Sequence, residues 1–356
     1  MRLLFIGCVP GNNLYHTTMN AGNDNVNCVF VLGIMPRSGT HYLRNLLCLH
    51  PECAESVLPE DGLIARSNIL MKYVTENYRG WEYVGDLPEI GAGELLAEEL
   101  GRGLLAFLKK ARCRAIERDT LPPAISRLKS DARYIVAKTP LVNNLKNFFS
   151  FFPGEKLLVL VRDGRDLVES RNLSFGVNRD ESIREWATAA RQIIKMKKKW
   201  EAEGRHFMIV KYEDLYQNTE AEMKNILGFL DLDAGKFDFH KALSAPVVGS
   251  SVFKRNGGEV HWHPVEKTPD FNPMTRSAGW TRWQHERFNW LASNELALFG
   301  YEPVKFKQGN LLIILRNHVC DFLYAMRLWT RRFRKLTYFI VKRLKLYFNN
   351  SNKRDT

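Results

Sequence analysis

The sequence predicts an α/β protein in which helices flank a parallel sheet, and three observations predict this class. Short apolar segments alternate with longer segments of helical periodicity. The run at residues 156–161 is apolar throughout, as is typical of a parallel strand buried on both faces. A strand at residues 29–33 leads into a turn of Pro, Ser, Gly and Thr and then into a helix, a P-loop-like order. We therefore expect ligands at the carboxyl ends of the strands.

The first half of the chain follows this alternation. Apolar spacing predicts a helix over residues 40–50, followed by a loop over 53–62 and then mainly helical sequence. Residues 92–118 have helical spacing interrupted by Gly and Arg, and 134–137 predict a short strand. Residues 141–152 predict a helix, because a Pro-Gly pair follows them.

The second half of the chain continues the alternation of strands and helices. After the strand at 156–161, an amphipathic helix is predicted over 181–203 and a strand over 206–211. A further helix is expected from Thr219, with Glu222 completing a capping box. Residues 245–283 mix Gly, Ser, Pro and Trp and predict loops.

Length and composition indicate one globular domain with a tail. The chain has 356 residues, enough to bury a full α/β core. No apolar run reaches the roughly 18 residues that a membrane-spanning helix needs. Residues 1–8 predict a strand or an ordered start, because no cleavage segment follows them. The six cysteines form no CxxC pair and show no metal spacing, which predicts reduced thiols and a cytoplasmic protein.

Charge divides the chain unequally. Of the net charge of +13, residues 305–356 carry +11, since thirteen Lys and Arg face only Asp321 and Asp355. The first 304 residues carry the remaining +2. We therefore predict a catalytic domain over 1–304 and a basic tail over 305–356.

Two segments predict an anion site. In the sequence PRSGT at residues 36–40, the turn and the helix N-terminus direct backbone N–H groups at an anion. Thr40 stands where a Walker A loop has Lys, and the cation is Arg37 instead. Arg162 ends the strand at 156–161, and if a helix begins near Gly164, Ser170 lies about two turns along it, so both can share an anion. The alternatives are an ordinary turn, an Arg162–Asp163 ion pair and a surface serine.

Together these segments resemble the sulfotransferases that use 3′-phosphoadenosine 5′-phosphosulfate (PAPS), over about residues 27–303. Their 5′-phosphosulfate loop reads PRSGT or PKSGT, and their 3′-phosphate site is an Arg closing a strand plus a Ser eight positions later. The resemblance implies the sulfotransferase fold, PAPS as co-substrate and adenosine 3′,5′-bisphosphate as product. It implies that PAPS is bound by Arg37, Ser38, Gly39, Thr40, His41, Tyr42, Arg162, Ser170, Tyr212 and Arg276.

The catalytic residues follow the same resemblance. Lys138 closes a strand, and Lys-Thr-Pro is similar to the Lys-(Ser/Thr/Asp)-Pro of the tyrosylprotein and heparan enzymes. The small-phenol enzymes carry a catalytic His two positions after this lysine, where this chain has Pro140. The resemblance therefore favours a Glu base in the loop after the first helix. Glu60 matches best, and Glu55 and Asp61 remain open.

Three further expectations are local. Tyr212 resembles the adenine-contacting Tyr of the family, with a buried aromatic as the alternative. Ser250 resembles a serine that reaches the active site, so the expected catalytic set is Glu60, Lys138, Arg37 and Ser250. His261 and His263 have no third ligand in view, and sulfuryl transfer needs no metal, so we expect no metal site.

The tail combines an apolar stripe with many cations. We expect residues 321–348 to form an amphipathic helix that binds an anionic membrane surface, such as the inner face of a membrane. The alternative is a helix packed on its own domain or on a partner subunit. Nucleic acid is not expected. The stripe consists of Phe322, Met326, Trp329, Phe333, Leu336, Ile340, Leu344 and Tyr347.

The predicted function is sulfuryl transfer from PAPS to a hydroxyl, or secondarily an amine. The acceptor class stays open between peptide tyrosine, a glycan, a glycolipid and a small metabolite. A P-loop nucleotide kinase or NTPase is the first alternative, but it requires a Lys after Gly39. A non-catalytic nucleotide- or membrane-binding module is the second, but it would not need Arg37, Lys138 and Glu60.

Overall fold

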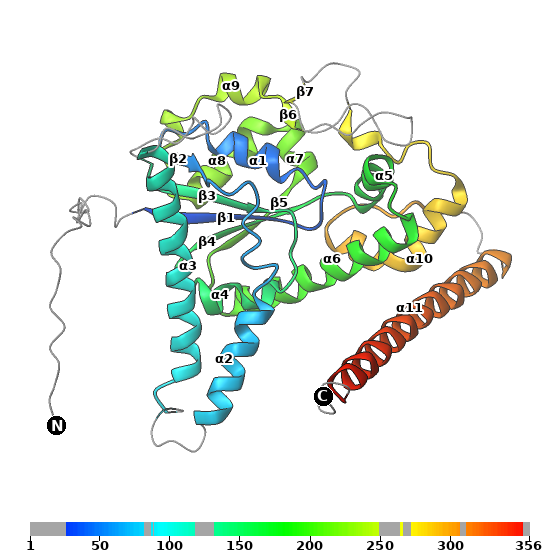
Figure 1. The fold of residues 1–356 in the computed structure, drawn as a ribbon. Coiled ribbons are helices and arrows are strands. Elements are labelled where there is room, and N and C mark those ends of the chain that lie inside the picture. The colour runs from blue at the N-terminus through cyan, green and yellow to red at the C-terminus, as the bar shows by residue number, and fades with distance from the viewer. Residues whose placement is uncertain are drawn as a thin grey trace, which may run out of the picture.

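The computed structural model describes residues 26–81, 87, 89–117, 132–248, 264–265, 272–306 and 311–351. Five parallel strands form one sheet in the order β2-β3-β1-β4-β5, with helices on both faces (Figure 1). The predicted α/β class with a parallel sheet is therefore confirmed. The strands are β1 (Asn27–Gly33), β2 (Cys53–Glu55), β3 (Tyr134–Thr139), β4 (Lys156–Val161) and β5 (Phe207–Lys211).

The central strands are buried on both faces, which explains their unbroken apolar sequence. Val29 and Val31 of β1 pack into one core, and Phe30 and Leu32, which alternate with them, pack into the other. The first core holds side chains of α1 (Thr40–Leu47), α7 (Tyr212–Gln217), α8 (Thr219–Phe229) and α9 (Phe239–Ser244). The second holds those of α2 (Asn68–Trp81), α3 (Ala92–Glu117), α4 (Phe148–Phe151), α5 (Gly164–Phe175), α6 (Arg179–Ala202) and α10 (Arg282–Leu298).

Several predicted elements are corrected. The loop expected over 53–62 contains β2, because residues 53–55 pair with β3. Within 141–152, only a 3₁₀ turn (Leu145–Asn147) and α4 are helical, since Asn144 takes a left-handed φ of 60°. The capping box at Thr219 is wrong: its hydroxyl donates to the Leu215 carbonyl, 2.8 Å away.

The loop-like region contains small elements in its described part. A second, antiparallel sheet pairs β6 (Val247–Val248) with β7 (Pro264–Val265). One short 3₁₀ turn, Ala234–Lys236, precedes this region, and another, Pro273–Thr275, lies within it. The last of these brings residues 273–280 back against α5, where they contribute to the site described below.

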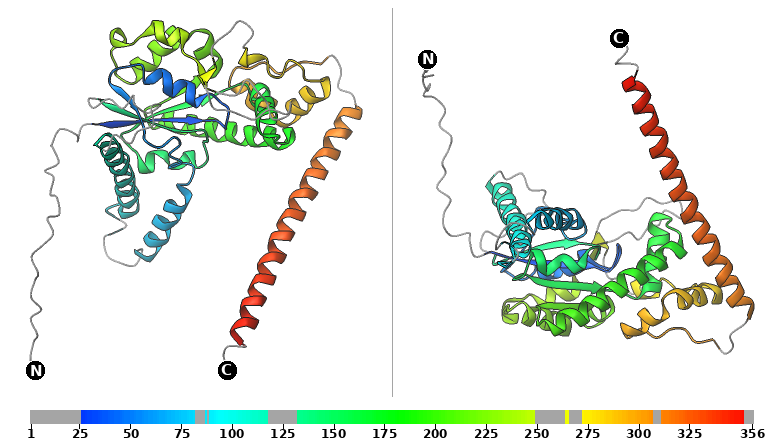
Figure 2. Two further views of the ribbon diagram at one scale, coloured as in Figure 1. Left: turned by 45° about the horizontal axis from the view of Figure 1, so that its top comes forward. Right: turned by 90° about the horizontal axis from the view of Figure 1, so that it is seen from below.

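The basic tail forms a single helix, α11 (Leu311–Ser351), which starts ten residues before the predicted helix. Its first turns contact α10 through Arg287, which bonds Asn317 and Asp321, and the rest extends away from the sheet and its helices (Figures 1 and 2). Among the described residues, no helix combines the length and the apolar character needed to cross a membrane. The division into domains at 304/305 stays a prediction.

Candidate active site

The site lies where three neighbouring strands end. β3, β1 and β4 are adjacent in the sheet, so their carboxyl ends meet at one edge. β3 ends in the Lys138-Thr139 pair, β1 runs into the loop of residues 34–39, and β4 is followed by Arg162. The loop of residues 34–39 is thereby brought next to Lys138 and Arg162, at the edge of the sheet where parallel α/β folds have the crevice that binds ligands.

The loop after β1 has the backbone of an anion cradle. Arg37 and Gly39 both have positive φ, 80° and 99°, and Gly39 caps α1 without a side-chain bond. The first N–H groups of α1 are therefore directed at the crevice. The Ser38 hydroxyl is fully buried and has no hydrogen-bond partner among the described residues. A buried hydroxyl without a partner is costly, so an acceptor such as a phosphate oxygen suits this position.

Arg162 connects the cradle to the loop of residues 273–280, which is distant in the sequence. Its guanidinium is buried and donates to the carbonyl of Arg37, 2.8 Å away, and to the carbonyl of Pro273. Arg162 Nε has no partner in the described part of the chain. Arg37 Nε lies 3.4 Å from Ser170 Oγ. Burial, and then the charges of Arg162 and Arg276, lower the pKa of Arg37 to about 10. Three arginines and a serine thus form a cationic cluster that suits a multiply charged anion.

The two simpler interpretations of these residues are wrong. Asp163 pairs with Arg165, with an Nη2–Oδ2 distance of 2.6 Å, and its carboxylate also accepts the Arg165 backbone N–H. Ser170 is 4% exposed, so it is not a helix-surface residue. Arg162 and Ser170 instead both contact Arg37, through its backbone carbonyl and its Nε respectively.

Tyr212 lies beneath the cradle. Its ring is 1% exposed, and Arg162 lies over it at 4.6 Å from the ring centroid. Tyr216 stacks on Tyr212, Tyr42 meets it edge-on, and burial raises the pKa of Tyr212. Both Tyr42 and Tyr212 therefore support the loop from the core. Their predicted contacts with the nucleotide stay predictions.

Lys138 occupies the other side of the crevice. Although it closes a strand, it is only 1% exposed, so it is not a solvated surface lysine. Its Nζ lies 2.8 Å from His41 Nε2 and 3.0 Å from Glu60 Oε1. Burial, and then the charge of Lys138, lower the pKa of His41 to about 3, and burial lowers that of Lys138. Because an ammonium group only donates, the neutral imidazole accepts at Nε2.

The three candidate bases differ in their surroundings. Glu60 is half exposed and contacts Lys138 directly. Glu55 lies in β2, is buried, and faces Arg44 at 3.6 Å. Asp61 accepts the Leu63 N–H at 2.9 Å, and burial raises its pKa. Of the three, Glu60 is the carboxylate that is both accessible from solvent and in contact with Lys138.

Two residues that the sequence did not reveal hold the distant loop in place. Asp166 of α5 accepts bonds from both the backbone N–H and the hydroxyl of Ser277, at 2.8 and 2.7 Å. Glu169, one turn later, accepts from Trp280 Nε1 at 2.8 Å. Arg276, next to Ser277, is thereby kept near Arg162, whose charge lowers its pKa after the larger effect of burial. Each pair spans 111 positions, and no local pattern predicts such a contact.

Some predicted residues lie outside the described part of the chain. These are Ser250, His261 and His263. Within the described ranges, no group of three or more His, Cys, Asp and Glu has the arrangement of a metal site.

Comparison with solved structures finds sulfotransferases with low sequence identity. The sulfotransferase domain of the Synechococcus PCC 7002 olefin synthase is 19% identical, covers 83% of this chain and 95% of its own, and has a TM-score of 0.36. The sulfotransferase domain of the curacin biosynthetic pathway is 18% identical, with coverages of 78% and 99% and a TM-score of 0.41. Sulfotransferase STF9 from Mycobacterium avium is 15% identical, with coverages of 78% and 78% and a TM-score of 0.36.

Sequence comparison gives the family. No curated protein sequence matches the chain significantly. The model of the sulfotransferase family, however, matches residues 28–236, which include the cradle, Lys138, Arg162 and Ser170. The likeness to the tyrosylprotein and heparan branch stays a prediction. Since the match spans more than half of its 356 residues, the chain belongs to the sulfotransferase family.

Proposed function

We propose that this sulfotransferase moves the sulfuryl group of PAPS onto a hydroxyl of a peptide tyrosine, a glycan, a glycolipid or a small metabolite. Adenosine 3′,5′-bisphosphate is the second product. The observation that carries the proposal is the cluster of Arg37, Arg162 and Arg276, in which Arg37 contacts the buried Ser170, beside the buried Lys138. So many cations side by side favour binding of a multiply charged anion, and PAPS carries charge at both its 3′ and 5′ positions.

The two ends of PAPS fit different parts of the crevice. The amide-lined turn of residues 38–42 suits the 5′-phosphosulfate, because the Ser38 hydroxyl has no hydrogen-bond partner in the described part of the chain. Arg162, Ser170 and Arg276 suit the 3′-phosphate, since Arg162 Nε lacks a partner among the described residues. PAPS supplies the activated sulfuryl group. Asp166 acts as a positioning residue, because it fixes the loop that carries Arg276.

The chemistry divides between Glu60 and the cations. Glu60 takes the proton of the acceptor hydroxyl as the new S–O bond forms and the bond from sulfur to the 5′-phosphate breaks. Lys138 and Arg37 stabilise the negative charge that develops on the transferring group and on the departing phosphate. The imidazole of His41 is neutral and lies 2.8 Å from Lys138 Nζ, so it orients the ammonium group by accepting a hydrogen bond and adds no second positive charge.

The proposal is tested by binding and by transfer. Calorimetry is expected to show that PAPS binds far more tightly than adenosine 5′-phosphosulfate, which lacks the 3′-phosphate. Ser170→Ala should weaken PAPS binding roughly 10–100-fold, because a hydrogen bond to a charged group is lost. Ser174→Ala, one turn later on α5 and equally buried, is the matched control and should bind normally.

Transfer itself is measured with sulfur-labelled PAPS against representatives of the four acceptor classes. Labelling of one class identifies the acceptor. Equal affinity for PAPS and adenosine 5′-phosphosulfate would refute the 3′-phosphate assignment. Absence of PAPS binding would refute the donor.

A further inference from the structure

The helix α11 contacts the rest of the protein through polar and aromatic groups at its beginning. Arg287, whose side chain is 6% exposed, donates to Asn317 Oδ1 at 3.1 Å and to Asp321 at 2.6 Å. Trp290 Nε1 donates to the other oxygen of Asp321 at 2.9 Å. Arg184 lies over the ring of Tyr324 at 4.2 Å. These contacts fix both the position and the rotation of α11 relative to α6 and α10.

This rotation turns the apolar stripe away from the domain. Asn317 and Met326 are nine positions apart, as are Tyr324 and Phe333, and nine positions are about two and a half helical turns. The two residues of each pair therefore lie on opposite sides of α11. Asn317 is 1% exposed on the side of the domain, whereas Met326 and Phe333 are 44% and 53% exposed on the other. The alternative that the stripe packs on its own domain is not what this geometry shows.

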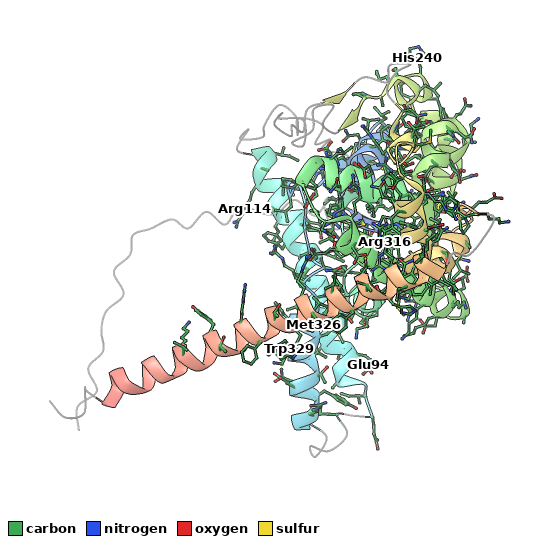
Figure 3. All side chains as sticks on the ribbon, turned by 90° about the vertical axis from the view of Figure 1, so that its right-hand side faces the viewer. Glu94, Arg114, His240, Arg316, Met326 and Trp329 are labelled. Carbon is green, nitrogen blue, oxygen red and sulfur yellow. The ribbon has the colours of Figure 1, made fainter. Side chains whose placement is uncertain are left out.

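The stripe is long and continuous over the described side chains. Apolar residues recur every three or four positions, and Trp329 is 60% exposed on the part of α11 that extends beyond the body (Figure 3). A contiguous exposed apolar surface of this kind marks a binding surface. The structure extends the stripe towards the start of α11, and the exposed apolar residues along it are Leu312, Leu315, Val319, Phe322, Met326, Trp329 and Phe333.

Charge decides which partner fits the stripe. Between residues 321 and 348 the sequence has eight Lys and Arg against one acid, Asp321. A second copy of α11 laid on the stripe would bring two such cationic arrays together with few acids to compensate them. An anionic bilayer neutralises the cations and takes up the apolar side chains at the same time. The exposed Arg327 and Arg334 have stems long enough to keep their charges among lipid headgroups.

We propose that α11 is an interfacial helix that docks this sulfotransferase on an anionic lipid surface through the stripe from Leu312 to Phe333. The polar contacts around Arg287 hold the helix so that the stripe already faces outward in the absence of a membrane. Docking therefore does not require the domain to unfold or α11 to rotate.

The test uses the full chain and vesicles of phosphatidylcholine with or without phosphatidylserine. The wild type is expected to co-sediment with the vesicles that contain phosphatidylserine, and added salt should weaken this binding without abolishing it. The double variant Trp329→Ser/Phe333→Ser should partition at least about tenfold less. Arg327→Gln/Arg334→Gln should lose about fivefold per cation on the anionic vesicles.

Tyr338→Ser is the matched control. Tyr338 is an exposed aromatic nine positions after Trp329 and therefore on the opposite side of α11. Tyr338→Ser should bind the vesicles as the wild type does. Unchanged thermal unfolding of all variants would show that the fold is kept. Failure of the wild type to bind, or equal losses for Tyr338→Ser and the stripe variant, would overturn the proposal. If sedimentation in the absence of vesicles showed a dimer for the wild type and a monomer for Trp329→Ser/Phe333→Ser, the stripe would be an interface with a second copy of the chain instead.

Discussion

The substitution Gly39→Ala tests how rigidly the core supports the anion cradle. A Cβ at residue 39 would lie 2.4 Å from Cδ2 and 2.6 Å from Cε2 of Tyr212. The Tyr212 ring is held between Arg162 and Tyr216 and cannot move aside without disturbing both. Positive φ costs Ala about 1–2 kcal/mol, and overpacking adds about 1–3 kcal/mol. We therefore expect a loss of about 2–5 kcal/mol in the free energy of unfolding.

The matched control is Gly204→Ala. Gly204 also has a positive φ, 63°, but its Cβ would meet nothing within 4 Å. It should lose only the backbone cost of about 1–2 kcal/mol. Urea unfolding of both variants measures the difference, and calorimetry should show PAPS binding weakened more than about tenfold for Gly39→Ala alone. If both variants lose the same stability and both bind PAPS normally, Tyr212 is not a rigid support for the cradle.

Three other predictions concern the catalytic side of the crevice. Glu60→Gln should lower turnover roughly 10²–10⁴-fold with PAPS binding kept, whereas Glu55→Gln should not; the reverse result would make Glu55 the base. Because folding lowers the pKa of His41 to about 3, the unfolded chain takes up its proton first, and stability is lost as pH falls from 6.5 towards 3. Wild type should thus lose about 2 kcal/mol more than His41→Gln between about pH 7 and pH 5 in urea titrations, and equal losses would contradict the burial of His41. Activity should survive EDTA, and its disappearance there would favour a metal-dependent reaction.

Local patterns predicted most of the sheet and the ends of its strands. Apolar runs and turn residues place Arg37, Lys138 and Arg162 where strands end, because a buried parallel strand has to be apolar along its whole length. The same patterns missed β2, which is three residues long and exists because β3 offers it hydrogen bonds. They also overestimated the helix around Asn144, whose left-handed backbone interrupts helical geometry.

The sequence by itself therefore determined the fold class, the family and the edge of the sheet at which the candidate site lies, since periodicity and short motifs are properties of neighbouring residues. Only the tertiary structure decided that Glu60 rather than Glu55 contacts Lys138, and that Asp166 holds the loop of Arg276. It alone decided that Arg287 turns the apolar side of α11 outward. Such contacts join residues about thirty to more than a hundred positions apart, and their geometry depends on how whole helices pack.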